Sequence, residues 1–151
     1  MKIKKVTKLT EKVFEAALKL LPQLDPHTNL PDKQYFKDLL ASGNTHFFIA
    51  GLDNRDIAGM LTIGTYLTPT GIKFWIEDVV VDEAQRGTGI GKDLIQFAID
   101  YAKSLGAKDI RLTSRPSRTA ANQLYIKMGF QQYETNVYKY KVPSLGAIEK
   151  V

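Results

Sequence analysis

Hydrophobic and polar positions along this chain follow two periods, one typical of helices and one typical of strands. The helical period predicts four helices, over residues 10–21, 32–41 and 89–105, and from Ser117 or Thr119 to Gly129. Apolar runs bounded by turn residues predict strands. These runs are residues 3–9, 47–52, 57–66, 72–81, 110–113, 131–134 and 137–142.

The segments between these elements carry the residues that turns require. Residues 22–31 form a turn punctuated by proline, Asp53-Asn54-Arg55-Asp56 has the length and composition of a hairpin loop, and residues 68–71 form the next turn. The sequence has no internal repeat, low-complexity tract or linker. It predicts one α+β domain over residues 1–151, with a central mixed, mostly antiparallel sheet flanked by helices.

Composition narrows the class of protein. The chain has 151 residues and no cysteine, which excludes disulfides and a thiol nucleophile. No apolar run approaches the ~20 residues of a membrane span. The start of the chain also lacks the apolar region of a signal peptide. The expectation is a cytoplasmic protein without a membrane partner.

The net charge of +5 comes from 21 basic and 16 acidic residues that are scattered along the chain. A nucleic-acid-binding protein would concentrate its basic residues in one patch, so nucleic acid is not an expected partner. A mild positive field still favours anionic ligands. His27 and His46 stand alone, without the spacing of metal ligands, so no metal site is expected.

The strand predicted over residues 72–81 leads into a glycine-rich turn that opens the next helix. Backbone N–H groups and the positive end of a helix suit a phosphate or a diphosphate. A Walker loop would need glycine in place of Arg86 and serine or threonine in place of Asp93. A dinucleotide fingerprint would need glycine in place of Lys92. Both of these phosphate-binding loops are excluded.

The remaining pattern, Arg86-x-x-Gly89-x-Gly91, resembles the pyrophosphate loop of the GNAT superfamily of acyl-CoA-dependent N-acetyltransferases. Its context is right for that loop, because a predicted strand precedes it and a predicted helix follows. The resemblance implies the GNAT fold, with acetyl-CoA as cosubstrate.

A second segment strengthens the resemblance. Asn122, Tyr125 and the pair Gly129-Phe130 match the family's second signature, an Asn and a Tyr on a helix followed by Gly-Phe. The two signatures occur in the family's order, with a predicted strand between them. The resemblance covers residues 74–140 through these motifs, and the first half of the chain only through its order of elements.

The resemblance implies that backbone N–H groups of residues 86–91 bind the diphosphate of coenzyme A. The backbone of residues 79–81 then pairs with the pantetheine arm, and one of its amides polarises the acetyl carbonyl as in an oxyanion hole. The alternative for the glycines is a tight strand-to-helix turn without a ligand. The implied cofactor-binding residues are Val79, Val80, Val81, Arg86, Gly87, Thr88, Gly89, Ile90, Gly91, Lys92, Thr113, Asn122 and Tyr125.

Tyr125 stands where the family commonly has its general acid, a tyrosine whose hydroxyl protonates the departing thiolate. A phenol with a pKa near 10 suits that proton transfer. The alternative is a core tyrosine, because Ala121, Leu124, Tyr125 and Met128 form an apolar helical stripe.

Glu77 and Asp78 are adjacent acids in an otherwise apolar strand, and strand alternation predicts that they point to opposite faces. Similar Glu-Asp-Val-Val-Val strands in sugar-phosphate acetyltransferases of the family place a candidate base at the first acid. The resemblance thus favours Glu77 as the base, direct or through water, that deprotonates the incoming ammonium. The alternative is an exposed or salt-bridged acid.

The implied reaction is direct transfer of acetyl from acetyl-CoA to a primary amine in a ternary complex. A small amine or amino-sugar is the favoured acceptor, with Arg115 and Arg118 meeting an anionic part of it or else lying on the surface. Two alternatives are a protein Lys or N-terminal acetyltransferase and a non-catalytic acyl-CoA sensor. The sequence leaves both a monomer and a homodimer open.

Overall fold

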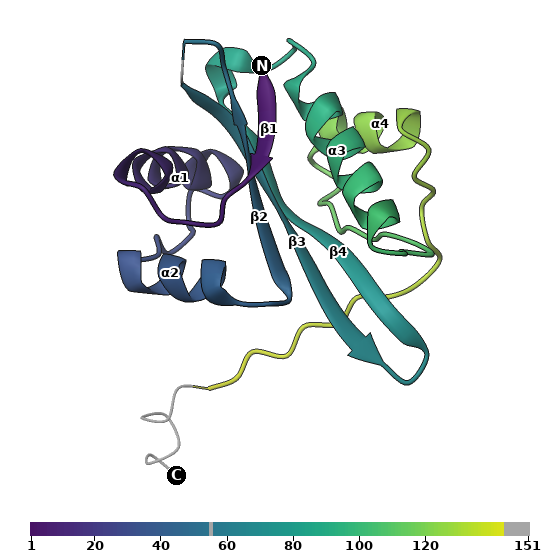
Figure 1. Cartoon of the computed structure of the whole chain (residues 1–151). Helices are drawn as coiled ribbons and strands as arrows, with labels where there is room; N and C mark the ends of the chain where they lie inside the picture. The colour runs from purple at the N-terminus through teal and green to yellow at the C-terminus, as the bar shows by residue number, and fades with distance from the viewer. Residues whose placement is uncertain (55, 144–151) are drawn as a thin grey trace.

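A four-stranded antiparallel sheet in the order β1-β2-β3-β4 forms the centre of the computed structural model, which describes residues 1–54 and 56–143. The helices α1 and α2 lie on one side of this sheet, and α3 and α4 lie on the other (Figure 1). The strands are β1 (Lys2–Lys5), β2 (Thr45–Gly51), β3 (Ile57–Thr68) and β4 (Gly71–Val81). The helices are α1 (Glu11–Leu24), α2 (Lys33–Ala41), the short 3-10 helix η1 (Glu83–Gln85), α3 (Ile90–Ser104) and α4 (Thr119–Lys127).

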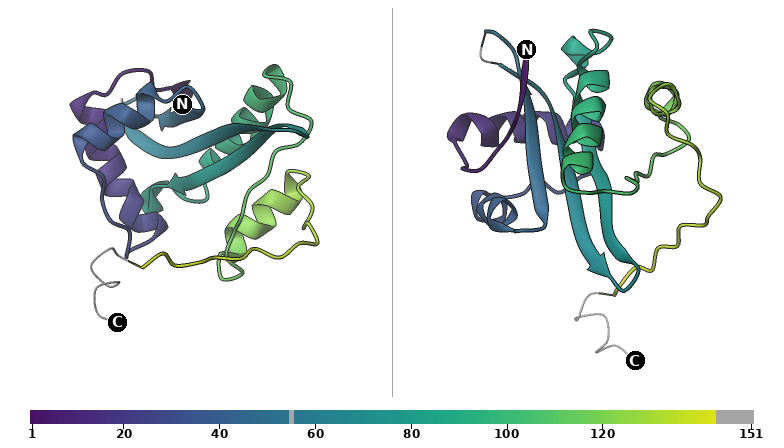
Figure 2. Two further views of the ribbon diagram at one scale, coloured as in Figure 1. Left: turned by 90° about the horizontal axis from the view of Figure 1, so that it is seen from below. Right: turned by 45° about the vertical axis from the view of Figure 1, so that its right-hand side comes forward.

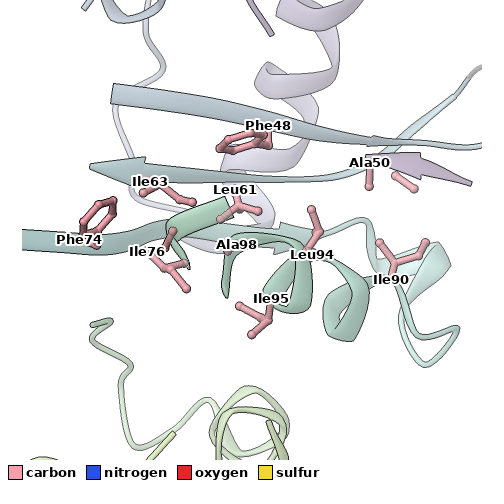
Figure 3. Close-up of a cluster of buried hydrophobic side chains, with 12 residues drawn as sticks. Phe48, Ala50, Leu61, Ile63, Phe74, Ile76, Ile90, Leu94, Ile95 and Ala98 are labelled. Carbon is pink, nitrogen blue, oxygen red and sulfur yellow. The ribbon is translucent and has the colours of Figure 1, made fainter. Parts of the chain in front are cut away.

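Both faces of the sheet are covered, so β2 is apolar along most of its length. Phe47 and Ile49 pack with α1 and α2 in one cluster, whereas Phe48 and Ala50 pack with α3 in the other. Successive strand residues point to opposite faces, which explains how a continuous apolar run serves two cores. Figure 3 shows the cluster on the α3 side, where the labelled helix residues are Ile90, Leu94, Ile95 and Ala98.

The predicted helices are present, with small differences at their ends. Thr10 caps α1 by accepting from Val13 N at 3.3 Å, and Asp32 caps α2 by accepting from Tyr35 N at 2.8 Å. α1 continues through Pro22 to Leu24, and because Pro22 has no N–H, the carbonyl of Leu18 lacks its helical hydrogen bond. α4 begins after Arg118 without a side-chain cap, so the prediction of a cap at Ser117 or Thr119 is wrong.

Three predicted strands differ from the structure. Residues 110–113 contribute a single parallel bridge between Arg111 and Trp75. The strands predicted over 131–134 and 137–142 are wrong, because no described residue from 131 to 143 belongs to a strand. A strand requires a neighbour with which to hydrogen-bond, and residue type alone does not supply one. Of the predicted hairpin loop after β2, Arg55 lies outside the described residues.

No helix in the described part of the chain is both long enough and apolar enough to span a bilayer. The glycine-rich loop lies between β4 and α3, at the end of the sheet where β4 stops. The position of that loop defines the candidate site.

Candidate active site

β4 is paired along the whole of one edge and along only part of the other. Its register with β3 extends from Gly71 to Val81 with one shift. On the outer edge, Ile76 N donates to Arg111 O at 2.7 Å and Arg111 N donates to Phe74 O at 3.0 Å. No further backbone pairing follows on this edge in the described residues. The end of β4, residues 77–81, therefore presents unpaired backbone groups to which an extended ligand can hydrogen-bond.

The glycine-rich loop begins where this edge ends. Gly87 and Gly89 have φ values of 78° and 95°, a left-handed conformation that costs most side chains roughly 1–2 kcal/mol. Gly89 is the N-cap of α3 and makes no side-chain cap, and the first helical bond runs from Asp93 N to Gly89 O at 3.0 Å. The N–H groups of residues 90–92 thus remain available at the positive end of α3, where an anion is stabilised.

Two polar side chains hold the shape of this loop. Arg86 Nε donates to Val81 O at 3.3 Å, and Thr88 Oγ1 donates to Gln85 O at 2.7 Å. The guanidinium of Arg86 is therefore anchored to the last residue of β4, and its terminal nitrogens add positive charge beside the loop.

A β-bulge follows Glu77 in β4. Glu77 is paired with Thr62 and Val80 with Met60, so two residues, Asp78 and Val79, lie opposite Leu61. Asp78 has a φ of 51°, the only positive value for a non-glycine residue in the described chain. Ile76 and Val79 both pack in the α3-side cluster, so the alternation shifts by one residue between them. The placement of Glu77 and Asp78 on opposite faces stays a prediction. Asp tolerates a positive φ better than most residues, but that preference alone did not reveal the bulge.

Glu77 and Asp78 lie on the part of β4 whose outer edge is unpaired. Partial desolvation, and then the negative charge of Asp78, raises the pKa of Glu77. Desolvation also raises the pKa of Asp78, although the positive charge of Arg118 opposes this shift. Both side chains keep contact with solvent. An accessible carboxylate with a raised pKa is suited to accept a proton.

The second sequence motif lies against the loop. A Cβ atom on Gly91 would lie 3.4 Å from Leu124 Cδ2, so the first turn of α3 packs closely on α4. The neighbouring Tyr125 is half-buried, and its ring meets Phe130 edge to face with 6.0 Å between centroids. Burial raises the pKa of Tyr125, with Arg118 acting in the opposite direction. The phenol therefore carries its proton at neutral pH.

The loop before α4 is held by hydrogen bonds of its own. Asn122 Nδ2 donates to Arg115 O at 3.0 Å, which leaves its side-chain oxygen for a ligand. Thr113 is exposed at the start of this loop. The hydroxyl of Ser114 is buried and has no hydrogen-bond partner among the described residues. An unpartnered buried hydroxyl beside the unpaired edge of β4 fits a site for a polar ligand.

Arg115 and Arg118 join this loop to the end of α1. Arg115 Nη2 donates to Asp25 Oδ2 at 2.9 Å, and Arg118 Nη2 donates to Leu24 O at 3.0 Å. A backbone bond from His27, and then Arg115, lowers the pKa of Asp25. The sequence predicted that the two arginines either meet an anionic part of a substrate or lie on the surface, and it offered no signal for these contacts between residues distant in the chain.

Neither a metal cluster nor a deep cavity marks the site. In the described ranges no group of three His, Asp or Glu side chains could hold a metal ion. A hollow of about 310 Å³ lies between α1 and the loop after β2, with Lys19 and Asp82 in its wall. A second hollow, of about 410 Å³, lies at the far end of the β3–β4 hairpin. The candidate site consists of the unpaired edge of β4 and the glycine-rich loop after it, and the residues that line the two hollows do not include residues 77–81 or 86–92.

Known proteins share this arrangement. A model of the Acetyltransferase (GNAT) family matches residues 10–130. Probable glucosamine 6-phosphate N-acetyltransferase 2 of Oryza sativa subsp. japonica is 33% identical over 130 residues, covering 80% of this chain and 75% of the relative. Aminoalkylphosphonate N-acetyltransferase of Salmonella typhimurium is 28% identical over 132 residues, covering 83% of this chain and 81% of the relative.

A solved structure confirms the predicted fold. The structure is that of an aminoglycoside acetyltransferase from an uncultured soil metagenomic sample, and it matches with a TM-score of 0.83 at 22% identity. The match covers 95% of this chain and 96% of the other. At this identity the likeness concerns the fold alone.

Proposed function

This chain belongs to the acetyltransferase (GNAT) family, and we propose that it transfers the acetyl group of acetyl-CoA directly to the primary amine of a small molecule. Members of the family are acyltransferases that use acetyl-CoA as cosubstrate. The observation that carries the proposal is the unpaired edge of β4 running directly into an uncapped helix N-terminus. An acyl-CoA needs both features, one for its amide-bearing arm and one for its diphosphate.

The residues that would hold acetyl-CoA are backbone groups for the most part. The amides of residues 86–91 bind the diphosphate, and the free edge at residues 79–81 pairs with the pantetheine arm. One amide of this edge polarises the thioester carbonyl. Thr113, Ser114 and Asn122 line the cleft on its other side. Acetyl-CoA supplies an activated acetyl group. The side chains of this chain then supply and remove the protons that the transfer requires.

Tyr125 supplies the first proton. The neutral amine nitrogen forms a bond to the carbonyl carbon, the carbon–sulfur bond breaks, and the Tyr125 hydroxyl gives its proton to the sulfur. The nitrogen, which becomes positively charged when its new bond forms, then releases a proton, and this proton restores the Tyr125 phenol directly or through water. A half-buried phenol that stays protonated suits this role. Its position beside the loop, one residue from the contact between Leu124 and Gly91, supports the assignment.

Glu77 removes a proton from the ammonium group of the incoming acceptor, directly or through water. The amine acceptor is an ammonium ion at neutral pH and must lose a proton before it can attack. A carboxylate with a raised pKa is a better base than an ordinary surface acid. Asp78 serves as the neighbour whose charge tunes Glu77.

Substituting the two acids separately tests this division of roles. Glu77 is active when ionised, so kcat/KM should fall as the pH drops through a pKa above the usual ~4.3 of a glutamate. Glu77→Gln should lower kcat/KM by about 10²-fold and abolish this fall of kcat/KM at low pH. Asp78→Asn removes a negative charge that raises the pKa of Glu77. The fall of kcat/KM should therefore occur at a lower pH, with activity at neutral pH retained. The measurement is a pH profile of kcat/KM for each variant. The opposite result, a large loss in Asp78→Asn alone, would make Asp78 the base.

The acceptor we propose is a small amine of the amino-sugar type that carries an anionic group. The names of the two relatives describe transfer to glucosamine 6-phosphate and to aminoalkylphosphonates, both amines that bear a phosphorus-centred anion. The charge of Arg118 acts on both Asp78 and Tyr125, and the side chain of Arg115 is 65% exposed despite its bond to Asp25. Their charge supports recognition of such an anion.

The proposal is tested by thiol release from acetyl-CoA across matched amines. We expect turnover with glucosamine 6-phosphate or aminoethylphosphonate, and kcat/KM at least ~10-fold lower with the uncharged analogue glucosamine. A lysine-containing peptide and a peptide with a free N-terminus complete the panel. Turnover of the peptides alone would identify a protein acetyltransferase. Binding of acetyl-CoA without turnover of any amine would favour a sensor.

A further inference from the structure

The end of α1 carries a carboxylate whose two oxygens have different partners. Asp25 follows the last residue of α1 and is its C-cap. Its Oδ1 accepts from His27 N at 3.0 Å, which holds the turn after the helix. Its Oδ2 accepts from Arg115 Nη2 at 2.9 Å, from a position 90 residues further along the chain. One oxygen therefore shapes the local turn, and the other binds the loop before α4.

The loop that carries Arg115 borders the candidate site. The adjacent hydroxyl of Ser114 is buried and has no hydrogen-bond partner among the described residues. Arg118 N donates to Arg115 O at 3.0 Å, which joins the two arginines in one turn. The charge of Arg118 acts on Asp78 and on Tyr125. Charges interact appreciably only within roughly 10 Å, so this turn lies within reach of a small acceptor bound beside these two groups.

The two arginines make contacts of different kinds with the end of α1. Figure 2 shows α1 and α4 on opposite sides of the sheet, and both contacts connect these sides. Arg118 is half-buried and donates to the backbone carbonyl of Leu24. The ion pair between Arg115 and Asp25 is more open, with the two side chains 65% and 31% exposed. Arg118 therefore fixes the loop to α1, whereas Arg115 is open to an exchange of partner.

The guanidinium of Arg115 has donors to spare. An arginine side chain has several N–H donors in a planar fork, and in the described chain this one makes a single side-chain hydrogen bond, to Asp25. An ion pair this exposed contributes little to stability. A phosphate or phosphonate group can accept parallel N–H bonds from one guanidinium. Such an anion can therefore displace the carboxylate of Asp25.

Acidity does not open this ion pair near neutral pH. The backbone bond from His27, and then the bond from Arg115, lower the pKa of Asp25. The carboxylate therefore stays ionised at neutral pH and below it. Arg115 becomes available through exchange with another anion rather than through protonation of Asp25.

We propose that Asp25 is a specificity-determining residue that occupies Arg115 until the anionic group of an acceptor replaces it. This role rests on the proposed function, in which the acceptor carries such a group. An anionic acceptor must displace Oδ2, so its apparent affinity is lower than Arg115 alone would give. An uncharged acceptor does not meet this competition. Asp25 thereby prevents stray anions from occupying the guanidinium, and it admits acceptors that form parallel bonds with Arg115.

Asp25→Asn tests the competition without removing the turn. The asparagine oxygen can still accept from His27 N, whereas its amide nitrogen cannot accept from Arg115. We expect the Kd of 2-aminoethylphosphonate to fall about 2- to 6-fold, the range that an exposed ion pair allows. The Kd of ethanolamine, which has a hydroxyl in place of the phosphonate, should not change. NMR titration of the full chain in the presence of coenzyme A measures both values.

Glu11→Gln is the matched control. Glu11 belongs to another exposed ion pair of α1, with Lys33 Nζ at 2.7 Å, so its substitution should change neither Kd. In an Arg115→Gln background, Asp25→Asn should no longer affect the Kd of 2-aminoethylphosphonate. Weaker binding in Asp25→Asn would show that Asp25 orients Arg115, and an unchanged Kd would show that the two anions do not compete. Either result overturns the proposal, as does a lack of binding to both chains.

Turnover distinguishes this role of Asp25 from the proposed reaction. If no amine is acetylated and 2-aminoethylphosphonate still binds more tightly to the Asp25→Asn chain, the proposed function fails and the role of Asp25 stands. If 2-aminoethylphosphonate is acetylated with the same kcat/KM by the native chain and by Asp25→Asn, the proposed function stands and the role of Asp25 fails. Thermal denaturation checks that each variant keeps the native fold.

Discussion

Replacing Tyr125 with phenylalanine is expected to lower kcat by about 10²- to 10⁴-fold, the usual contribution of a general acid. The substitution removes one oxygen from a half-buried ring and keeps the packing against Phe130, so the fold and the KM for acetyl-CoA should change little. Because burial raises the pKa of Tyr125, the native enzyme should lose activity only at a pH above the usual ~10 of a phenol. The variant should not show this loss of activity at high pH.

Tyr101→Phe provides the control for this loss. Tyr101 is a half-buried tyrosine on α3 whose hydroxyl lies 3.2 Å from His46 Nδ1, remote from the cleft. Its substitution should leave kcat within about twofold of the native value. Steady-state kinetics of both variants measures the effect on catalysis, and thermal denaturation measures the effect on stability. If Tyr125→Phe retained native kcat and lost only stability, Tyr125 would be a core residue and the general acid would be another group.

Two substitutions of Gly89 test the diphosphate site. Asn and Asp have nearly the same shape, but only Asp carries a negative charge. Asn and Asp both tolerate the positive φ of Gly89, and both are favourable at the N-cap of a helix. Gly89→Asn should therefore weaken acetyl-CoA binding only several-fold. Gly89→Asp adds a negative charge where the diphosphate binds, at a cost of roughly 2–3 kcal/mol, or about 10²-fold in Kd.

Calorimetric titration with coenzyme A measures this difference, and thermal denaturation checks the fold. We expect the two variants to have similar melting temperatures, slightly below the native value, because each places a side chain at the positive φ of Gly89. The difference in Kd for coenzyme A between the two variants should be smaller at high salt, where charge repulsion is screened. Equal Kd values for Gly89→Asn and Gly89→Asp would show that no anion binds at this loop.

Local patterns predicted most of the elements because their causes are local. The apolar face of α3 and the hairpin strands β3 and β4 follow from residue spacing and turn composition. The glycine loop was also recognisable, because its positive φ values demand glycine at fixed positions.

Contacts between distant segments could not be predicted in this way. Arg115 binds Asp25, and Arg118 binds the carbonyl of Leu24, in segments far apart in the sequence. The strand predicted over residues 137–142 has the right residue types, but it pairs with no other strand among the described residues. Whether a β-prone segment becomes a strand depends on a partner elsewhere in the fold or in another chain.

The sequence by itself determined the order of elements, the loop with its two signatures, and the residue types available for acid and base. Periodicity, glycine placement and side-chain chemistry are properties of short segments. Only the tertiary structure decided that β4 loses its neighbour after Ile76, that a bulge follows Glu77, and that α4 packs on the loop through Gly91. Each of these depends on how strands and helices align in space, because hydrogen-bond register and burial are set jointly by segments that the chain connects only at long range.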